Sequence, residues 1–169
     1  FLVRLPLSEN VATEAVKKEV IVDSRPTELV GRILVVDDEA GVREFLMLML
    51  GQMGLVVDTA PNGKAALDVF FGSPKPYDLV ITDLTMPEMG GLEFLDELQL
   101  KNTTLAEPRL AKVLLCSGLP DFTFDADRYP MVVGLLNKPF NLALLRKRLL
   151  TAGLGESNQA DQEKARQSL

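Results

Sequence analysis

The chain has 169 residues, 47% apolar and 25% charged, as expected of a single globular domain with some surplus. It contains no histidine and one cysteine, which excludes Ser-His-Asp and Cys-His catalysis, a phosphodonor histidine, an internal disulfide and a cysteine-based zinc site. A net charge of -6 argues against binding to a nucleic-acid backbone. The longest apolar run, Phe45–Leu50, is far shorter than the roughly 20 residues of a membrane span. We therefore expect a cytoplasmic domain with no membrane insertion in this segment.

The first 31 residues differ in pattern from those that follow. Residues 1–7 (FLVRLPL) predict a short strand that Pro6 ends, without the features of a signal peptide. Residues 8–31 are of mixed charge with little periodicity, which is typical of a linker. Because the first residue is Phe1 rather than Met, we expect the chain to be part of a longer protein.

Five short apolar runs follow and predict five strands. The first, Ile33–Val36, is continuous, as expected of a strand that is buried on both faces. The other predicted strands cover residues 55–57, 79–82, 112–116 and 131–136.

Segments of helical period separate these strands. Gly54 ends the first helix, whose apolar stripe recurs at i, i+3, i+4, i+7, i+8 and i+11. That stripe consists of Val42, Phe45, Leu46, Met49, Leu50 and Met53. Asn62 can cap a second helix, which Gly72–Pro74 ends, and Pro139 lies near the start of the last helix. The predicted buried face of the second helix is Ala66, Val69 and Phe70. A third helix is indicated by Leu92, Leu95 and Leu98, and the apolar stripe of the last helix is Leu142, Leu145 and Leu149.

Two segments are predicted from weaker patterns. Residues 121–129 predict a short additional helix, which Pro130 ends. Residues 153–169 are polar and predict a frayed tail. Strands that alternate with helices in this way favour an α/β domain, with a parallel sheet covered by helices on both faces. Such a sheet has a switch point in its strand order, and ligands bind there, beyond the carboxyl ends of the strands.

Polar side chains follow four of the predicted strands. Asp37 and Asp38 follow the first strand, Asp83 the third, Ser117 the fourth and Lys138 the fifth. Each has an ordinary structural interpretation, as a helix cap, a turn former or a solvated lysine.

A parallel sheet brings these strand ends to one edge, where together they favour phosphoryl chemistry. Three crowded carboxylates repel one another and tend to hold protons, and a hard cation such as Mg²⁺ relieves this repulsion. One carboxylate can then attack phosphorus to form an acyl phosphate. The ammonium of Lys138 and the hydroxyl of Ser117 can hydrogen-bond the equatorial oxygens. Asp58 and Asp78 also lie near strand ends, and we interpret them as solvated loop carboxylates.

Four stretches resemble the receiver domain of two-component response regulators. They are ILVVDDE at 33–39, VITDLTMPEMGG at 80–91, LLCSG at 114–118 and LLNKPF at 135–140. The resemblance covers residues 32–152, roughly seven tenths of the chain. It implies a flavodoxin-like (βα)5 fold with a sheet of order 2-1-3-4-5, which agrees with the switch-point argument.

The resemblance also implies roles for the acidic residues. Asp83 is the phosphoacceptor, and Asp37 and Asp38 form the acidic pair. Mg²⁺ is expected to bind Asp38, Asp83 and the main-chain carbonyl of Thr85 directly, and Asp37 mainly through water.

Three further residues concern the phosphorylated state. By resemblance, Lys138 pairs with the phosphoryl group and Ser117 is the switch hydroxyl. The family often places an aromatic switch residue three positions before this lysine, where the present chain has Leu135. The departure leaves the phosphoacceptor chemistry intact and puts the route of the signal to the surface in doubt.

The first seven residues have a resemblance of their own, to the last strand of the ATP-binding domain of sensor histidine kinases. We therefore expect the C-terminal receiver of a hybrid histidine kinase, a transferase whose parent chain can be membrane-anchored upstream. The 17 residues after Ala152 are too few for an output domain, so we expect no binding of nucleic acid.

Three functions compete at this point. The first is a phosphorelay switch that takes a phosphoryl group from a histidine kinase or a histidine-phosphotransfer protein. It would have self-phosphorylation and self-dephosphorylation chemistry, and homodimerisation is left open. The second is a phosphorylation-independent interaction module, a pseudo-receiver. Such modules often lack one of five site residues that are all present here: Asp37, Asp38, Asp83, Ser117 and Lys138. The third is a phosphohydrolase of the haloacid-dehalogenase type, which needs a second acid where this chain has Thr85. Whether the fragment counts as an enzyme stays open.

Overall fold

The apolar runs form a parallel five-stranded sheet. The structure is a computed structural model and describes residues 28–155. Its strands are β1 (Arg32–Val36), β2 (Val56–Ala60), β3 (Leu79–Asp83), β4 (Lys112–Ser117) and β5 (Val132–Asn137). The strand order is β2-β1-β3-β4-β5, and every pairing is parallel, which confirms the predicted topology. The switch point therefore lies between β1 and β3.

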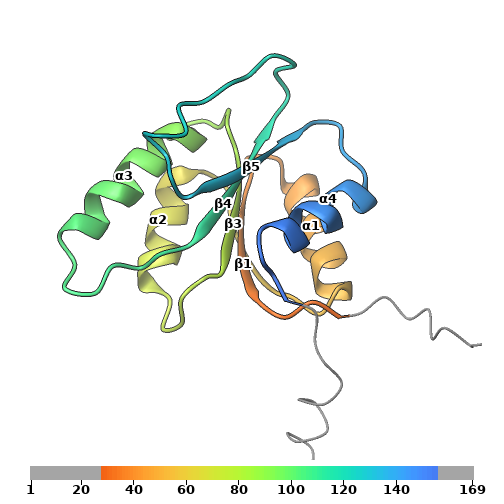
Figure 1. The fold of residues 1–169 in the computed structure, drawn as a ribbon, viewed down its shortest axis with the longest axis horizontal. Coiled ribbons are helices and arrows are strands. Elements are labelled where there is room, and N and C mark those ends of the chain that lie inside the picture. Colours follow the sequence, from red (N-terminus) through yellow and green to blue (C-terminus); the bar gives the residue numbers. More distant parts are fainter. Residues whose placement is uncertain (1–27, 156–169) are drawn as a thin grey trace, which may run out of the picture.

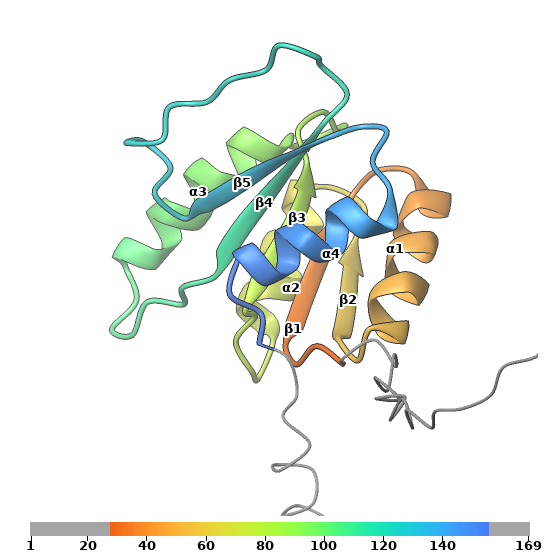
Figure 2. The ribbon, with the colours of Figure 1, turned by 45° about the vertical axis from the view of Figure 1, so that its right-hand side comes forward.

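Helices cover both faces of the sheet, as predicted (Figures 1 and 2). They are α1 (Ala40–Gln52), α2 (Gly63–Gly72), α3 (Gly91–Thr103) and α4 (Leu142–Thr151). The core cluster on one face includes residues from α1 and α4, and the cluster on the other face includes residues from α2 and α3.

The strand β1 explains why the first apolar run is unbroken. Ile33 and Val35 belong to the cluster under α1 and α4, whereas Leu34 and Val36 belong to the cluster under α2 and α3. Successive side chains of a strand point to opposite faces, and both faces of this sheet are buried. The loop that follows β1 is therefore held on a rigid central strand.

The predicted cap of α2 is confirmed, because Asn62 Oδ1 accepts a hydrogen bond of 2.9 Å from the Ala65 N–H.

One residue of the α1 stripe was predicted wrongly. Leu46 and Leu50 are buried, but 54% of Phe45 is exposed. Phe45 lies about 100° around the helix from Leu46, at the margin of the stripe.

The connection from β4 to β5, residues 118–131, contains no helix, so the helix predicted over 121–129 is wrong. The segment is instead a loop with local turns: Asp125 Oδ1 accepts the N–H of Asp127 at 3.0 Å. Its end is tied to α3, since Asp96 accepts hydrogen bonds from Arg128 (2.8 Å) and from the Tyr129 hydroxyl (3.0 Å). The apolar side chains of this segment, which include Phe122, contact the core without a helical period.

Of the two carboxylates that we predicted to be solvated loop residues, Asp78 is exposed in the loop before β3, as predicted, whereas Asp58 is not a loop residue. Asp58 lies inside β2, where its carboxylate accepts from the Arg32 guanidinium at 2.6 Å and from the Tyr77 hydroxyl at 2.7 Å. Asp78 accepts from the Arg32 backbone N–H at 2.7 Å. Both acids accept hydrogen bonds from Arg32, the first residue of β1, so they lie near the edge of the sheet opposite to Asp37, Asp38 and Asp83.

The packed core extends slightly beyond residues 32–152. Leu29, which falls in the predicted linker, is 1% exposed, and Leu154 is 6% exposed. The two ends of the described segment meet, because the Val30 N–H donates to the Gly155 carbonyl at 3.0 Å. The predicted strand at 1–7, most of the linker and the tail from residue 156 lie outside the described residues. Within residues 28–155, no helix has the length and apolar character needed to cross a membrane.

Candidate functional site

Three carboxylates meet at the carboxyl edge of the sheet. Asp37 and Asp38 follow β1 and Asp83 ends β3, and these two strands are neighbours. One carboxylate oxygen from each of the three lies within 4.8 Å of the others. Asp37 is buried, Asp83 is half-buried and Asp38 is exposed. The structure thus brings together the acids that the strand ends predicted.

Lys138, just after β5, joins two of these acids. Its ammonium donates to Asp37 Oδ2 at 2.8 Å and to Asp83 Oδ2 at 3.0 Å. Burial alone would lower the pKa of Lys138, but the hydrogen bonds to Asp37 and Asp83 and their negative charges outweigh burial and raise this pKa above its ordinary value. The lysine therefore carries a positive charge at neutral pH.

The two acids of the β1 loop have different surroundings. Asp37 uses both carboxylate oxygens, because Oδ1 accepts the Glu39 N–H at 3.0 Å and Oδ2 accepts from Lys138. The carboxylate of Asp38 makes no hydrogen bond with any residue from 28 to 155. Asp38 is thus the acid whose oxygens are most available to an additional ligand.

The charges and donor atoms of the cluster fit a hard divalent cation. Three carboxylates face one ammonium, which leaves two negative charges uncompensated when all four groups are ionised. Oxygen ligands are those that Mg²⁺ prefers, and it needs only one or two carboxylates because it keeps several waters. Thr85 follows Asp83 by two residues in the loop after β3, close in sequence to the cluster.

Ser117 and Leu135 lie outside the hydrogen-bonded cluster. Ser117 ends β4 and is 1% exposed, and its carbonyl accepts the Lys138 N–H at 2.7 Å. Its hydroxyl is engaged with Leu119, whose N–H donates to Oγ at 2.9 Å. Leu135, on β5, is half-buried against the core under α2 and α3. The serine is therefore at the correct edge of the sheet, with its hydroxyl turned to the loop.

Sequence reasoning missed Arg43, on the first turns of α1. Its guanidinium Nη1 donates to the carbonyl oxygens of Asp37 at 2.7 Å and Asp38 at 3.0 Å. The signal was available: a cation near a helix N-terminus is disfavoured by the helix dipole, so it needs a compensating contact.

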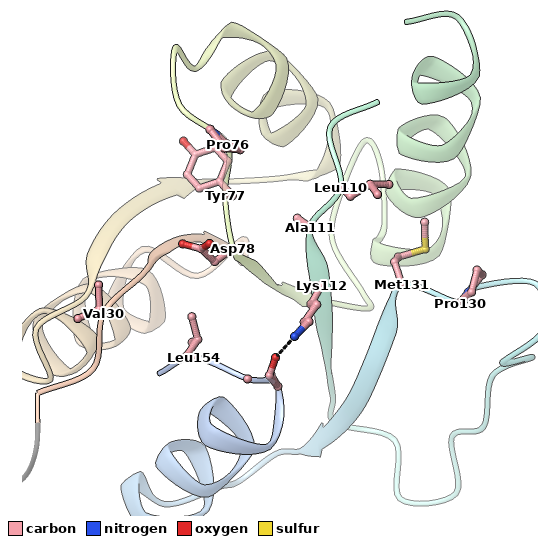
Figure 3. A pocket seen from close by; sticks show the side chains of 12 residues that line it. Val30, Pro76, Tyr77, Asp78, Leu110, Ala111, Lys112, Pro130, Met131 and Leu154 are labelled. Atoms are coloured by element: carbon pink, nitrogen blue, oxygen red, sulfur yellow. Dashed lines mark hydrogen bonds between the residues drawn. The ribbon is translucent and has the colours of Figure 1, made fainter. Parts of the chain in front are cut away.

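A cavity of about 620 Å³ opens at the opposite edge of the sheet, among Val30, Tyr77, Leu110 and Met131 (Figure 3). Its lysine, Lys112, donates to the Ala152 carbonyl oxygen at 2.6 Å and so caps the carboxyl end of α4. No strand-end acid from the cluster lines this cavity.

The chain thus combines a parallel sheet of order β2-β1-β3-β4-β5 with three carboxylates and a lysine at its carboxyl edge. The chain belongs to the response regulator receiver domain family, whose profile matches residues 33–150. A curated relative, the response regulator ArlR of Staphylococcus epidermidis, is 34% identical over 117 residues, which are 69% of this chain and 50% of ArlR. The chain thus spans about half the length of such relatives.

Solved receiver structures have the same fold. The response regulator TrrA from Thermotoga maritima, in complex with Mg²⁺ and BeF, is 36% identical, with a TM-score of 0.59 over 72% of this chain and 97% of TrrA. A structure of the histidine kinase ThkA in complex with TrrA matches at 35% identity and a TM-score of 0.58, over 72% of this chain and 97% of the matched chain.

Proposed function

We propose that this domain is a phosphorelay acceptor in which Asp83 takes a phosphoryl group from a phosphohistidine. The observation that carries the proposal is the Lys138 ammonium, which bridges Asp37 and Asp83 at 2.8 and 3.0 Å. A phosphoryl group on Asp83 places its negative oxygens beside this donor. Membership of the receiver family supports the same chemistry.

In the proposed transfer, a carboxylate oxygen of Asp83 attacks the phosphorus of the phosphohistidine. The new O–P bond forms as the P–N bond breaks, and the electron pair returns to the imidazole, which then takes a proton from solvent. Lys138 stabilises the equatorial oxygens of the transferred group. Both oxygens of Asp83 accept hydrogen bonds, from Lys138 and from the Leu84 N–H at 2.8 Å, so the carboxylate is held in one orientation.

Mg²⁺ is the cofactor that we propose for this cluster. Asp38, Asp83 and the carbonyl of Thr85 would hold it directly, and the buried Asp37 would act mainly through water. The cation supplies charge neutralisation, which lets an anionic donor approach three carboxylates. The Mg²⁺–BeF complex of TrrA supports this choice.

The donor lies on another molecule or on another part of the parent protein, because the chain has no histidine. We propose a histidine kinase or a histidine-phosphotransfer protein, in line with the ThkA–TrrA complex. The exposed face of α1 is the surface proposed for this contact. It begins beside the acidic pair and exposes 54% of Phe45 and 60% of Leu48.

The resemblance of residues 1–7 to a kinase strand supports the origin of the chain as the C-terminal receiver of a hybrid histidine kinase. These residues lie outside the described part of the chain. The upstream sequence of the parent protein tests this origin directly. An upstream ATP-binding domain is the expected result, and its absence would contradict the proposal.

The test of the acceptor function is phosphorylation by acetyl phosphate, followed by intact mass. We expect the wild-type chain to gain one phosphoryl group in the presence of Mg²⁺ and none with excess EDTA. Asp83→Asn should abolish the gain, whereas Asp68→Asn, at an exposed acid of α2, should not. A wild-type chain that gains no mass would favour the alternative, a pseudo-receiver.

A further inference from the structure

The backbone of the acidic loop is held by a cation that lies on α1. Arg43 donates through one nitrogen, Nη1, to the carbonyl oxygens of two successive residues, Asp37 at 2.7 Å and Asp38 at 3.0 Å. Within residues 28–155, its guanidinium makes no ion pair with the carboxylates of the cluster. The contact therefore acts on the peptide groups of the loop and not on the acidic side chains.

This contact matters most for Asp38. The side chain of Asp37 is fixed by Lys138 and by the Glu39 N–H. The carboxylate of Asp38 has no hydrogen bond within the described residues, so its position follows from its own backbone. Charge-assisted hydrogen bonds from a guanidinium are strong and directional, and here they fix the carbonyl that belongs to this backbone.

We propose that Arg43 is a positioning residue for the cation site. By clamping the carbonyls of Asp37 and Asp38, it holds the carboxylate of Asp38 near Asp83 before a cation binds. The inference rests on the proposed function, because it assumes that Mg²⁺ binds this cluster.

The clamp and the charge of Arg43 have opposite effects on Mg²⁺ affinity. A positive charge near the cluster repels a second cation, so removal of the charge alone would tighten Mg²⁺ binding. Loss of the clamp lets the Asp38 backbone move and weakens binding. The sign of the change therefore separates the two roles.

The experiment is an Mg²⁺ titration of the 169-residue chain, followed by amide NMR, for the wild type and three variants. Arg43→Ala should bind Mg²⁺ roughly 10-fold more weakly, at the low end of the effect of residues that support metal ligands. Arg43→Lys keeps the charge and one donor nitrogen. Its Mg²⁺ affinity should lie between that of the wild type and that of Arg43→Ala. Glu44→Ala, at the adjacent exposed position of α1, should bind like the wild type.

A second measurement uses the metal-free protein and is independent of Mg²⁺. The Glu39 amide, which donates to Asp37 Oδ1, should exchange with solvent faster in Arg43→Ala than in Glu44→Ala. Unchanged exchange at Glu39, or Mg²⁺ binding by Arg43→Ala as tight as or tighter than that of the wild type, would overturn the proposal. If Arg43→Ala fails to fold, Arg43→Lys replaces it in the test. Wild-type Mg²⁺ affinity together with wild-type exchange at Glu39 in Arg43→Lys would also overturn the proposal. A wild-type chain that binds no Mg²⁺ would refute the proposed function itself.

Discussion

The hydroxyl of Ser117 is hydrogen-bonded in both directions to the backbone of Leu119, as acceptor from its N–H at 2.9 Å and as donor to its carbonyl at 3.2 Å. Leu119 is the second residue of the helix-free segment 118–131. A phosphoryl group on Asp83 would offer Ser117 a stronger acceptor. The movement of Ser117 would then release Leu119, and the first response would fall on this loop.

We predict that beryllium trifluoride, a phosphoryl mimic, produces large amide NMR shifts at residues 84–88 and 117–120 and small shifts at 132–136 and 142–150. The distal shifts are small because Leu135 has no ring to move, and weak coupling gives a small population shift. Ser117→Ala should remove the shifts at 118–120 and keep those at 84–88. Strong, uniform shifts across β5 and α4 would show that Leu135 does not weaken the switch.

The domain boundary makes a second prediction, about stability. Leu29 is 1% exposed and its N–H donates to the Met53 carbonyl, whereas 61% of its neighbour Val30 is exposed. Leu29→Ala should lower the free energy of unfolding by about 2–4 kcal/mol through lost burial and a residual cavity. Val30→Ala should change it by less than about 0.5 kcal/mol. Urea unfolding of both variants measures the difference, and equal stabilities would place Leu29 outside the core.

The sequence predicted the sheet and the cluster because both depend on strong local patterns. Continuous apolar runs such as Ile33–Val36 indicate strands buried on two faces, and parallel strands bring their end residues to one edge. The segment 118–131 has apolar residues without a period, so its pattern did not separate a helix from a loop. The contacts of Asp58 and Arg43 depend on strand register and on the turn after β1, which a local pattern does not contain.

The tyrosines provide a prediction about pH. The chain has two, Tyr77 and Tyr129, and burial raises the pKa of both hydroxyls, with additional effects of hydrogen bonds to Asp58 and Asp96. An unfolded tyrosine loses its proton near pH 10, so the folded state retains protons that the unfolded state has lost. Stability should therefore fall as the pH rises above about 10. Absorbance of tyrosinate in the folded chain should appear at higher pH than in urea, and coincident titrations would contradict this.

Recognition of the donor protein should depend on the exposed face of α1. Phe45→Asp places a charge on this face. Because burial of an unpaired charge at an interface is costly, this variant should accept a phosphoryl group from a cognate phosphorylated histidine protein about 10-fold or more slowly than the wild type. Phosphorylation by acetyl phosphate should not change, since the hydrogen bonds that hold the cluster are made by Lys138, Glu39 and Leu84 and not by Phe45. Leu110→Asp, at an 81% exposed leucine on the opposite edge of the sheet, is the matched control. Equal transfer rates for the two variants would exclude α1 as the contact surface.

Lys138 should affect Mg²⁺ in the direction opposite to Arg43. Its ammonium neutralises Asp37 and Asp83 directly, at 2.8 and 3.0 Å, so Lys138→Ala leaves the carboxylates with less positive charge nearby. We therefore expect Mg²⁺ to bind this variant at least as tightly as the wild type. The phosphoryl oxygens, however, lose their charge-assisted donor, so the beryllium trifluoride shifts at 117–120 should be much reduced. Lys147→Ala, on the exposed side of α4, should match the wild type in both measurements. A large loss of Mg²⁺ affinity in Lys138→Ala would mean that the lysine orders the cluster, as we propose for Arg43, and does not mainly balance its charge.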